Sequence, residues 1–540
     1  MVMKIKRKHD FSKVPGPRIQ RSKFNRSTNL KTAFDAGILV PIFVDEALPG
    51  DTFNLKMTAF SRMATPIYPL MDNLYMDTFF FAVPNRLLWD NWQKFNGEQD
   101  NPSDSTDFVT PKLESSPTGG YAINSIHDYL GFPTGVSGLA PNAFFHRAYN
   151  LIWNEWFRDQ NLQDSAVVNT GDGPDLLSDY ELRRRGKRHD YFTSCLPWPQ
   201  KGPAVELPLG STAPVIPSLP DAGGNFETGG RDRTYVVNYA AGPNYGKVFS
   251  SSVGLGSNGS EGLTDVGGPT IGSSKLGFGL EADLASATAS TVNQLRQAFQ
   301  IQRLYERDAR GGTRYTEIVR SHFGVVSPDS RLQRPEYLGG GSSHVNITPV
   351  AQTSGSGAYT ETPQGSLAAM GTVNIHNHGF NKSFTEHCVI IGLVAVRADL
   401  TYQDGLNRMF SRSTRWDYYW PTLAHIGEQA VLNKEIYAQG TAQDDEVFGY
   451  QERYAEYRYK PSSITGVFRS SAPQSLDAWH LAQDFTSLPS LSGTFIQENP
   501  PMDRVIAVPS EPDFIFDGDF RLMCARPMPV YSVPGLIDHF

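Results

Sequence analysis

The stretch that decides the fold of this chain is EHCVIIGLVAVRADLTYQDGLNRMFSRSTRWDYYWP, residues 386–421. It opens with nine uncharged, mostly apolar residues, 388–396, which are rich in β-branched valine and isoleucine. A membrane span needs about 20 apolar residues, and a half-exposed strand would alternate apolar and polar side chains. Residues 388–396 therefore predict a short β-strand that is buried on both faces.

The stretch continues into a run of arginine and aromatic residues that is a candidate contact surface. Its members are Arg408, Arg412, Arg415, Trp416, Tyr418, Tyr419 and Trp420. Protein–protein interfaces favour arginine and aromatic side chains, and surfaces that bind single-stranded nucleic acid favour them as well. A solvated face whose aromatic rings lie along the surface explains the run about equally well.

Further strand patterns are scattered along the chain between long connections, and helical patterns are few. The expected strands are 52–60, 74–83, 455–460 and 513–523, whereas 38–44, which contains Pro41, suits an edge strand or an irregular extended segment. The expected helices are 142–159, 288–310 and 314–323, with a shorter one capped by Asn85. Frequent glycine and proline also favour strands joined by long loops over a helical bundle. This arrangement is typical of a jelly roll with elaborated loops.

Basic residues are concentrated at the N-terminal end. Residues 1–31 contain ten Lys and Arg and one acidic residue, a net charge of +9, whereas residues 32–540 contain 38 basic and 55 acidic residues, a net charge of −17. The first 31 residues have few large apolar groups to offset the cost of ordering, so we expect an arm that is ordered by its partners. The candidate nucleic-acid contacts are Lys4, Lys6, Arg7, Lys8, Lys13, Arg18, Arg21, Lys23 and Arg26. A frayed, solvated terminus is the alternative.

Motifs for catalysis or cofactor binding are weak. Residues 254–259 match GxGxxG, but they lack the preceding strand and following helix that a dinucleotide site needs. His376 and His378 have no further ligand at a diagnostic spacing, and no GxSxG is present. We therefore expect no catalytic residue, no cofactor and no metal ion. The widely spaced cysteines fit a reducing compartment rather than a disulfide framework: Cys195, Cys388 and Cys524.

Two further segments stand out by composition. Residues 183–189, RRRGKRH, form a basic cluster that suits a solvated loop, an interface or a DNA contact, and the sequence does not decide among them. Residues 202–279 contain 17 glycines in 78 positions, against 49 in 540 for the whole chain. Long irregular segments inside a compact protein usually carry function or are disordered. We interpret this one as an insertion that leaves the body of the fold.

Five long blocks, in order from near the N-terminus to residue 469, resemble one protein family. They are SKFNRSTNLKTAFDAGILVPIFVDEALPGDTF (22–53), FFFAVPNRLLWDNWQKFNGE (79–98), QRLYERDARGGTRYTEIVRSHFGVVSPDSRLQRPEYLGGGS (302–342), VIIGLVAVRADLTYQDGLNRMFSRSTRWDYYWPTLAHIGEQAV (389–431) and GYQERYAEYRYKPSSITGVFR (449–469). The family is the major capsid proteins of gokushoviruses, small icosahedral single-stranded DNA phages of the Microviridae. The resemblance is much weaker in residues 100–140 and 200–285.

The resemblance implies a mainly β fold, an eight-stranded antiparallel viral jelly roll with long inter-strand insertions and a few short helices. It implies that 60 copies form a T=1 shell around a single-stranded DNA genome, assembled in the host bacterial cytoplasm and found in the virion. The implied partners are further copies of the chain, the DNA, a small basic DNA-binding protein and a host cell-surface receptor. We expect no membrane insertion, because no segment is long and apolar enough.

The expected parts of the chain are a basic arm (1–31), a first part of the jelly-roll body (32–201), the glycine-rich insertion (202–285) and a second part of the body (286–540). In the family, an insertion at about this place forms a surface protrusion near the threefold axes. The candidate contact residues of this protrusion are Phe226, Tyr235, Val237 and Tyr239. The alternatives are a phage-associated polysaccharide hydrolase, which would need paired carboxylates in a cleft, and a β-rich, lectin-like protein that binds the host.

Overall fold

The computed structural model describes residues 20–202, 292–312, 315–323, 333–354 and 364–531, together with four short strands between residues 215 and 282. The strands are β1 (Ser22–Asn25), β2 (Thr28–Phe34), β3 (Val40–Ala47), β4 (Thr52–Met63), β5 (Leu74–Pro84), β6 (Val215–Ser218), β7 (Tyr235–Val237), β8 (Lys247–Phe249), β9 (Gly279–Ala282), β10 (Glu336–His344), β11 (Asn346–Ala351), β12 (Leu367–Ser383), β13 (Cys388–Ala398), β14 (Glu428–Leu432), β15 (Val447–Glu452) and β16 (Phe514–Arg526). The α-helices are α1 (Trp92–Phe95), α2 (Ile126–Tyr129), α3 (Phe144–Ile152), α4 (Val292–Gly311), α5 (Tyr315–Phe323), α6 (Asn433–Ile436) and α7 (Gly493–Ile496).

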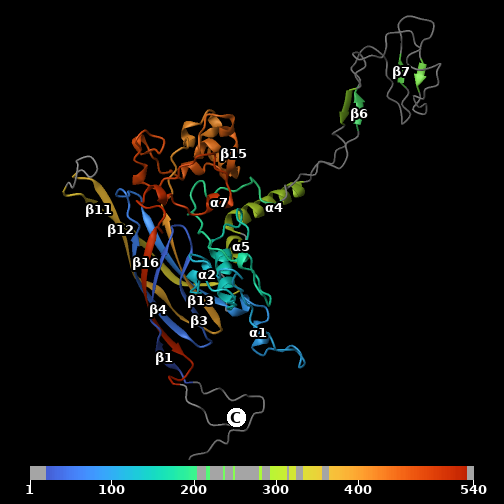
Figure 1. Cartoon of the computed structure of the whole chain (residues 1–540). Coiled ribbons are helices and arrows are strands. Elements are labelled where there is room, and N and C mark those ends of the chain that lie inside the picture. The colour runs from blue at the N-terminus through green and yellow to red at the C-terminus, as the bar shows by residue number, and fades with distance from the viewer. Residues whose placement is uncertain are drawn as a thin grey trace, which may run out of the picture. The chain divides into compact units, whose positions relative to one another are not determined.

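Two antiparallel sheets form the body of the fold (Figure 1). The six-stranded sheet has the order β1-β16-β4-β12-β11, with β2 also paired to β16, and the four-stranded sheet has the order β10-β5-β13-β3. Strands β2 and β1 pair with successive parts of β16 and share one edge position, while β11 adds a strand beyond β12. When β1 and β2 are counted as one position and β11 is left out, each sheet has four strand positions. The predicted jelly roll is therefore confirmed, with more strands than the eight that were expected.

Strand β13 is buried on both faces, as residues 388–396 predicted. Ile390 and Val394 belong to the hydrophobic core shared by the two sheets, whereas Val389 and Ile391 belong to a second core on the opposite side. All residues of β13 are buried, and β5 and β3 pair with its two edges. The core leaves no space for a side chain at Gly392, because a Cβ there would lie 2.7 Å from a ring carbon of Phe80.

The strands of the six-stranded sheet are buried on one face. Strand β4 alternates buried and exposed or half-exposed side chains along its whole length, and β16 does so over most of its length. This confirms the half-buried strands expected at 52–60 and 513–523. Strand β5 confirms the strand expected at 74–83, and β3, which contains Pro41, lies at a sheet edge as expected.

Helix α3 covers the second core. Tyr149 and Ile152 are fully buried there, and the Tyr149 hydroxyl donates a hydrogen bond to the Leu39 carbonyl oxygen at 2.8 Å. A π-helical turn, Trp153–Phe157, prolongs the helix, so the helical segment matches the expected 142–159 closely. Trp156, which lies in this turn, is 40% exposed.

A buried ion pair fixes α3 against the surrounding loops. Arg147 binds both carboxylate oxygens of Asp175, at 2.8 and 2.6 Å, and also donates to the Leu88 and Gly171 carbonyl oxygens. Asp175 further accepts hydrogen bonds from Asn169 and Tyr180. The side chains of the pair are 1% and 0% exposed, so nearly every polar atom of a costly buried pair is satisfied.

Local structure differs from expectation at three places. Residues 455–460 contain a 3₁₀ turn, Ala455–Tyr457, where alternating side chains had indicated a strand. Asn85 does not cap a helix; it begins a 3₁₀ turn, Asn85–Leu87, without a side-chain cap bond. Residues 22–34, expected largely as part of an arm, pair with β16, because the exposed edge of that strand offers backbone partners. The expected start of α4, residue 288, lies outside the described residues.

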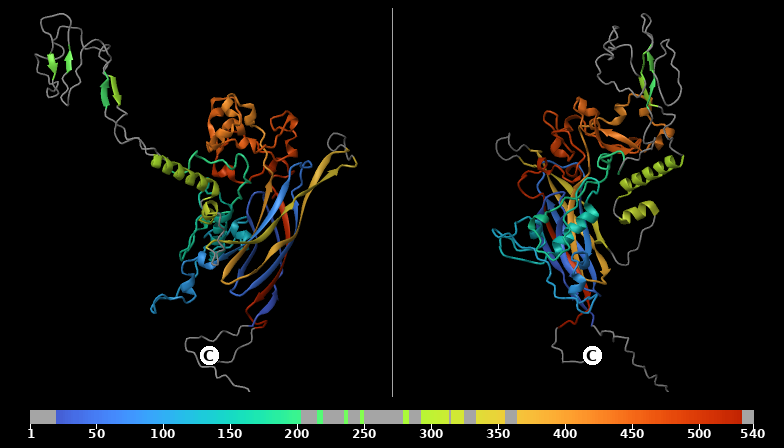
Figure 2. Two further views of the ribbon diagram at one scale, coloured as in Figure 1. Left: turned by 180° about the vertical axis from the view of Figure 1, so that it is seen from behind. Right: turned by 90° about the vertical axis from the view of Figure 1, so that its right-hand side faces the viewer.

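Residues 399–513, which connect β13 to β16, lie at the end of the two sheets opposite β1 (Figure 1; orange in Figure 2). A third core, which includes Tyr402, Val431 and Phe448, holds this connection together. The chain divides into two compact units, residues 1–201 with 307–540 and residues 202–306. In the second unit β6 pairs with β9 and β7 with β8, both antiparallel.

Candidate subunit interface

The arginine–aromatic run forms an ordered loop on the connection between β13 and β16. Three 3₁₀ turns shape it: Arg408–Phe410, Arg415–Asp417 and Pro421–His425. The Asp417 carboxylate accepts hydrogen bonds from the Ser413 and Thr414 backbone N–H groups, at 3.0 and 2.8 Å, and those with Thr414 are the main cause of its lowered pKa. The loop therefore has a defined shape even though it lies outside both sheets.

Two arginines of the run hold the loop to the third core. Arg408 donates to the Glu435 carboxylate at 2.9 Å and to the Ala430 carbonyl oxygen at 2.7 Å. Arg412 pairs with Glu456 at 3.4 Å. Their side chains are only 20% and 10% exposed, so the structure places these two residues as anchors beneath the surface.

The aromatic residues of the run are exposed to solvent. Trp416, Tyr418 and Tyr419 are 53, 52 and 51% exposed. We call the surface that they form with their exposed neighbours the aromatic face; its members, linked by ring and guanidinium contacts, are Trp416, Tyr418, Tyr419, Trp420 and Tyr457. Contiguous exposed apolar surface is uncommon on proteins that act alone and marks an interaction site.

The aromatic face is fixed in position by hydrogen bonds and ring contacts. The Trp420 indole N–H donates to the Arg415 carbonyl oxygen at 2.9 Å, and the Arg415 guanidinium lies 4.3 Å from the centre of the Trp416 ring. Arg453 donates to the Trp416 carbonyl oxygen at 2.9 Å. The Tyr419 ring lies at a steep angle to the Tyr457 ring. Side chains that are already ordered lose little entropy when a partner binds.

Sequence reasoning missed Tyr457, which completes the aromatic face. The alternation of residues 455–460 had assigned it to a half-buried strand, whereas the 3₁₀ turn brings it against Arg412, whose guanidinium lies 4.2 Å from its ring centre. No signal in the sequence distinguishes these two conformations. Glu435 and Glu456, the acidic partners of the anchors, also carry no motif, since they are recognised only by their positions in space.

The candidate nucleic-acid contacts fall into two groups. Lys4, Lys6, Arg7, Lys8, Lys13 and Arg18 lie outside the described residues. Arg21, Lys23 and Arg26 lie on or next to β1. Arg26 is engaged within the chain, because its guanidinium contacts both carboxylate oxygens of Asp45, at 2.8 and 2.6 Å.

The candidate contacts of the protrusion are also divided. Phe226 and Tyr239 lie outside the described residues, whereas Tyr235 and Val237 are the ends of β7 and pair with Phe249 and Lys247 of β8.

Within the described ranges, no group of three or more His, Cys, Asp or Glu residues is placed to hold a metal ion, and no helix is long and apolar enough to cross a membrane. His378 hydrogen-bonds to the Thr78 hydroxyl at 2.8 Å. Cys195, Cys388 and Cys524 are buried free thiols.

Comparison with known proteins gives a consistent result. The family model described as "Capsid protein (F protein)" matches residues 12–536. Three proteins named capsid protein VP1 are similar over 98% of this chain and 98% of their own length: those of Bdellovibrio phage phiMH2K (51% identical), Chlamydia phage 1 (46%) and Spiroplasma virus 4 (38%). The similarity therefore spans the aromatic face as well as both sheets.

Proposed function

The chain belongs to the Capsid protein (F protein) family, and from this premise we propose that 60 copies form a T=1 icosahedral shell in which the aromatic face is a contact between subunits. It is a structural major capsid protein of the gokushovirus type, which self-assembles into a shell and resides in the virion. Repeated symmetric contacts that close on themselves fix the size of such a shell. We assign the chain no catalytic step.

The aromatic face is the observation that carries the choice of contact. Tryptophan, tyrosine and arginine supply most of the binding energy at interfaces, often above about 2 kcal/mol per residue when truncated. Here the tryptophan and tyrosine side chains are about half exposed in one copy, and their backbone is held by internal hydrogen bonds. Burying them against a neighbour removes apolar surface from water without a large ordering cost.

The test is the yield of particles from phage genomes that encode Trp416→Ala or Arg415→Ala. We expect both variants to stay soluble, to melt like the unaltered chain and to form few particles on a sucrose gradient. The control is Tyr531→Ala, which truncates an aromatic residue that is 80% exposed outside the aromatic face. If the variants at Trp416 and Arg415 form particles in full yield, the aromatic face is not a subunit contact.

We also propose that the basic residues before β1 contact the single-stranded DNA genome without sequence preference. Clustered charge without a recognition helix suits phosphate contacts. Each phosphate neutralised on a single strand adds about 0.7 to the salt slope of binding. Deletion of residues 1–19 should lower both DNA packaging and that slope, whereas Arg521→Gln should not. A small basic DNA-binding protein, a further proposed partner, could replace the arm, so the deletion is repeated in phage that lack this protein. Unchanged packaging and an unchanged salt slope in that background would contradict the role.

We infer that the glycine-rich insertion projects outward and binds a host receptor. Glycine adds no side chain to a core and loses the most entropy on ordering, so the body of the fold gains little from this segment. Copies clustered around a threefold axis would raise avidity roughly 100-fold or more. Replacing residues 205–276 by a short Gly/Ser linker should leave particles that package DNA but adsorb poorly to cells. Normal adsorption would place the receptor site elsewhere, and loss of shells would make the segment an assembly element.

A further inference from the structure

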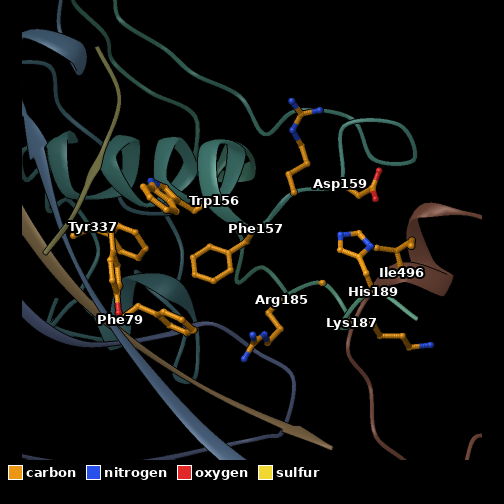
Figure 3. A pocket seen from close by; sticks show the side chains of 12 residues that line it. Phe79, Trp156, Phe157, Asp159, Arg185, Lys187, His189, Tyr337 and Ile496 are labelled. Carbon is orange, nitrogen blue, oxygen red and sulfur yellow. The ribbon is translucent and has the colours of Figure 1, made fainter. Parts of the chain in front are cut away.

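A cavity of about 410 Å³ opens at the four-stranded sheet, at a place separate from the aromatic face (Figure 3). Aromatic side chains form one side of it, among them Phe79, Trp156, Phe157 and Tyr337. Polar and charged side chains form the other side, where Asp159, Arg185, Lys187 and His189 gather. The basic cluster of residues 183–189 thus contributes to a built cavity beside exposed aromatic rings.

The aromatic side of the cavity has the character of a protein interface. Trp156 and Tyr337 are 40 and 43% exposed, although each could bury far more apolar area. Trp156 is held in place, because its indole N–H donates to the Pro335 carbonyl oxygen at 3.0 Å. Such ordered, half-exposed rings next to charged groups match the enrichment found at subunit contacts.

Most of the positive charge near the cavity is already engaged. Arg185 pairs with Asp77 at 2.5 Å. Lys187 is buried, with its ammonium 4.5 Å from the Phe495 ring centre. His189, which lines the cavity, and Arg188, which precedes it in the chain but does not line the cavity, are both exposed. In the part of the chain that the structure describes, their side chains have no hydrogen-bond or ion-pair partner. This small positive surplus suits one or two carboxylates better than a row of phosphates.

A complementary surface lies elsewhere on the same chain. The loop of residues 97–109 follows α1 and extends outward from the sheets (Figure 1). No lysine or arginine interrupts it between Lys94 and Lys112, and its acidic residues are Glu98, Asp100, Asp104 and Asp107. Asp104 shapes the loop by accepting the Asn101 backbone N–H at 2.8 Å.

The other three acidic residues of this loop are available to a partner. Glu98, Asp100 and Asp107 are exposed, and within the described ranges none of them forms an ion pair. Two residues beyond Asp107, the Val109 side chain is 68% exposed. The loop thus offers carboxylates next to an apolar group, the reverse of the charge at the cavity.

We propose that the loop of residues 97–109 docks at this cavity of a neighbouring copy. The carboxylates, Asp107 foremost, face Arg188 and His189, while Val109 packs against the aromatic side. The contact rests on the proposed shell, in which every copy supplies one loop and one cavity to different neighbours, a heterologous arrangement that closes by symmetry. It is distinct from the contact made by the aromatic face.

Charge reversal tests the pairing. Phage genomes are made with Arg188→Glu, with Asp107→Arg and with both, and particle yield is measured by sedimentation at low salt. Each single change sets like charges against each other and should lower the yield about tenfold or more. The double change restores opposite charges at every contact and should return the yield to within about twofold. Glu511→Arg, a reversal at an exposed residue elsewhere, is the control.

The outcomes separate this contact from the proposed shell. Rescue by the double change supports the docking. Full yield of both single variants overturns it while leaving the shell intact, and low yield of all three variants, each soluble and melting normally, places the two charges in separate contacts. Normal shells of Arg188→Glu that lack DNA would assign the cluster to nucleic acid. If the unaltered chain forms no closed shell, the proposed function itself fails.

Discussion

Replacing Arg147 by methionine isolates the buried ion pair that fixes α3 against the loops around it. Methionine keeps much of the side-chain volume but removes four hydrogen bonds. The Asp175 carboxylate, 0% exposed, would keep only the neutral donors Asn169 and Tyr180.

The size of the effect follows from this burial. Removing one partner of a buried pair costs about 3–5 kcal/mol, because the other charge stays uncompensated. The Leu88 and Gly171 carbonyl oxygens lose a donor as well, at about 1 kcal/mol or more each. We expect a loss of about 4 kcal/mol or more, a large share of a typical unfolding free energy of about 5–15 kcal/mol. At roughly 1 °C per kcal/mol for a chain of this length, the melting temperature should fall by about 4 °C or more.

The assay is thermal unfolding of the unassembled chain, with Arg458→Met as the matched control. Arg458 pairs with Glu452 at the surface, where the two side chains are 60 and 42% exposed, so its loss should cost less than about 1 kcal/mol. Adding Asp175→Asn to Arg147→Met should recover part of the loss by removing the buried charge. Equal melting temperatures for Arg147→Met and Arg458→Met would refute the reasoning.

Three further predictions concern pH, packing and the interface loop. Burial raises the pKa of Asp513 to about 6. Between about pH 4 and 6 the folded chain therefore binds more protons than the unfolded chain, and stability falls as pH rises. Asp513→Asn should flatten this pH dependence of the melting temperature and raise the free energy of unfolding at pH 7 by about 2–3 kcal/mol. Gly392→Ala should lower the free energy of unfolding by about 1–3 kcal/mol in denaturant titration, since the added Cβ meets the buried Phe80 ring. An unchanged denaturant midpoint would show that the core accommodates the extra carbon. Glu456→Gln weakens the anchoring of Arg412, so residues 408–426 should exchange amide hydrogens faster while β13 keeps its protection, and equal exchange of the loop would contradict the anchoring role.

The sequence predicted those strands whose burial pattern is visible within a single segment of the chain. A continuous apolar run indicated β13, and alternating side chains indicated β4 and β16. Pro41 left an edge strand or an irregular segment open for β3, which lies at a sheet edge. Each of these patterns reports which faces of one element are buried, so it can be read without knowing the neighbours.

The parts that failed depend on partners distant in the sequence. Alternation at 455–460 indicated a strand, but alternation also arises in a turn whose side chains pack against another loop. The division of the arginine–aromatic run into buried anchors and exposed contacts depends on Glu435 and Glu456. The cavity joins β5, β10, the π-helical turn after α3 and residues 185–189. None of these combinations has a motif.

The most direct test of the central claim is a cryo-electron microscopy reconstruction of the assembled particle at side-chain resolution. We expect 60 copies, about 3.6 MDa of protein at 59.8 kDa each, with Trp416, Tyr418 and Trp420 of every copy packed against a neighbouring copy. A shell of another copy number, or a map in which these side chains face solvent or the interior with no neighbouring copy in contact, would contradict it.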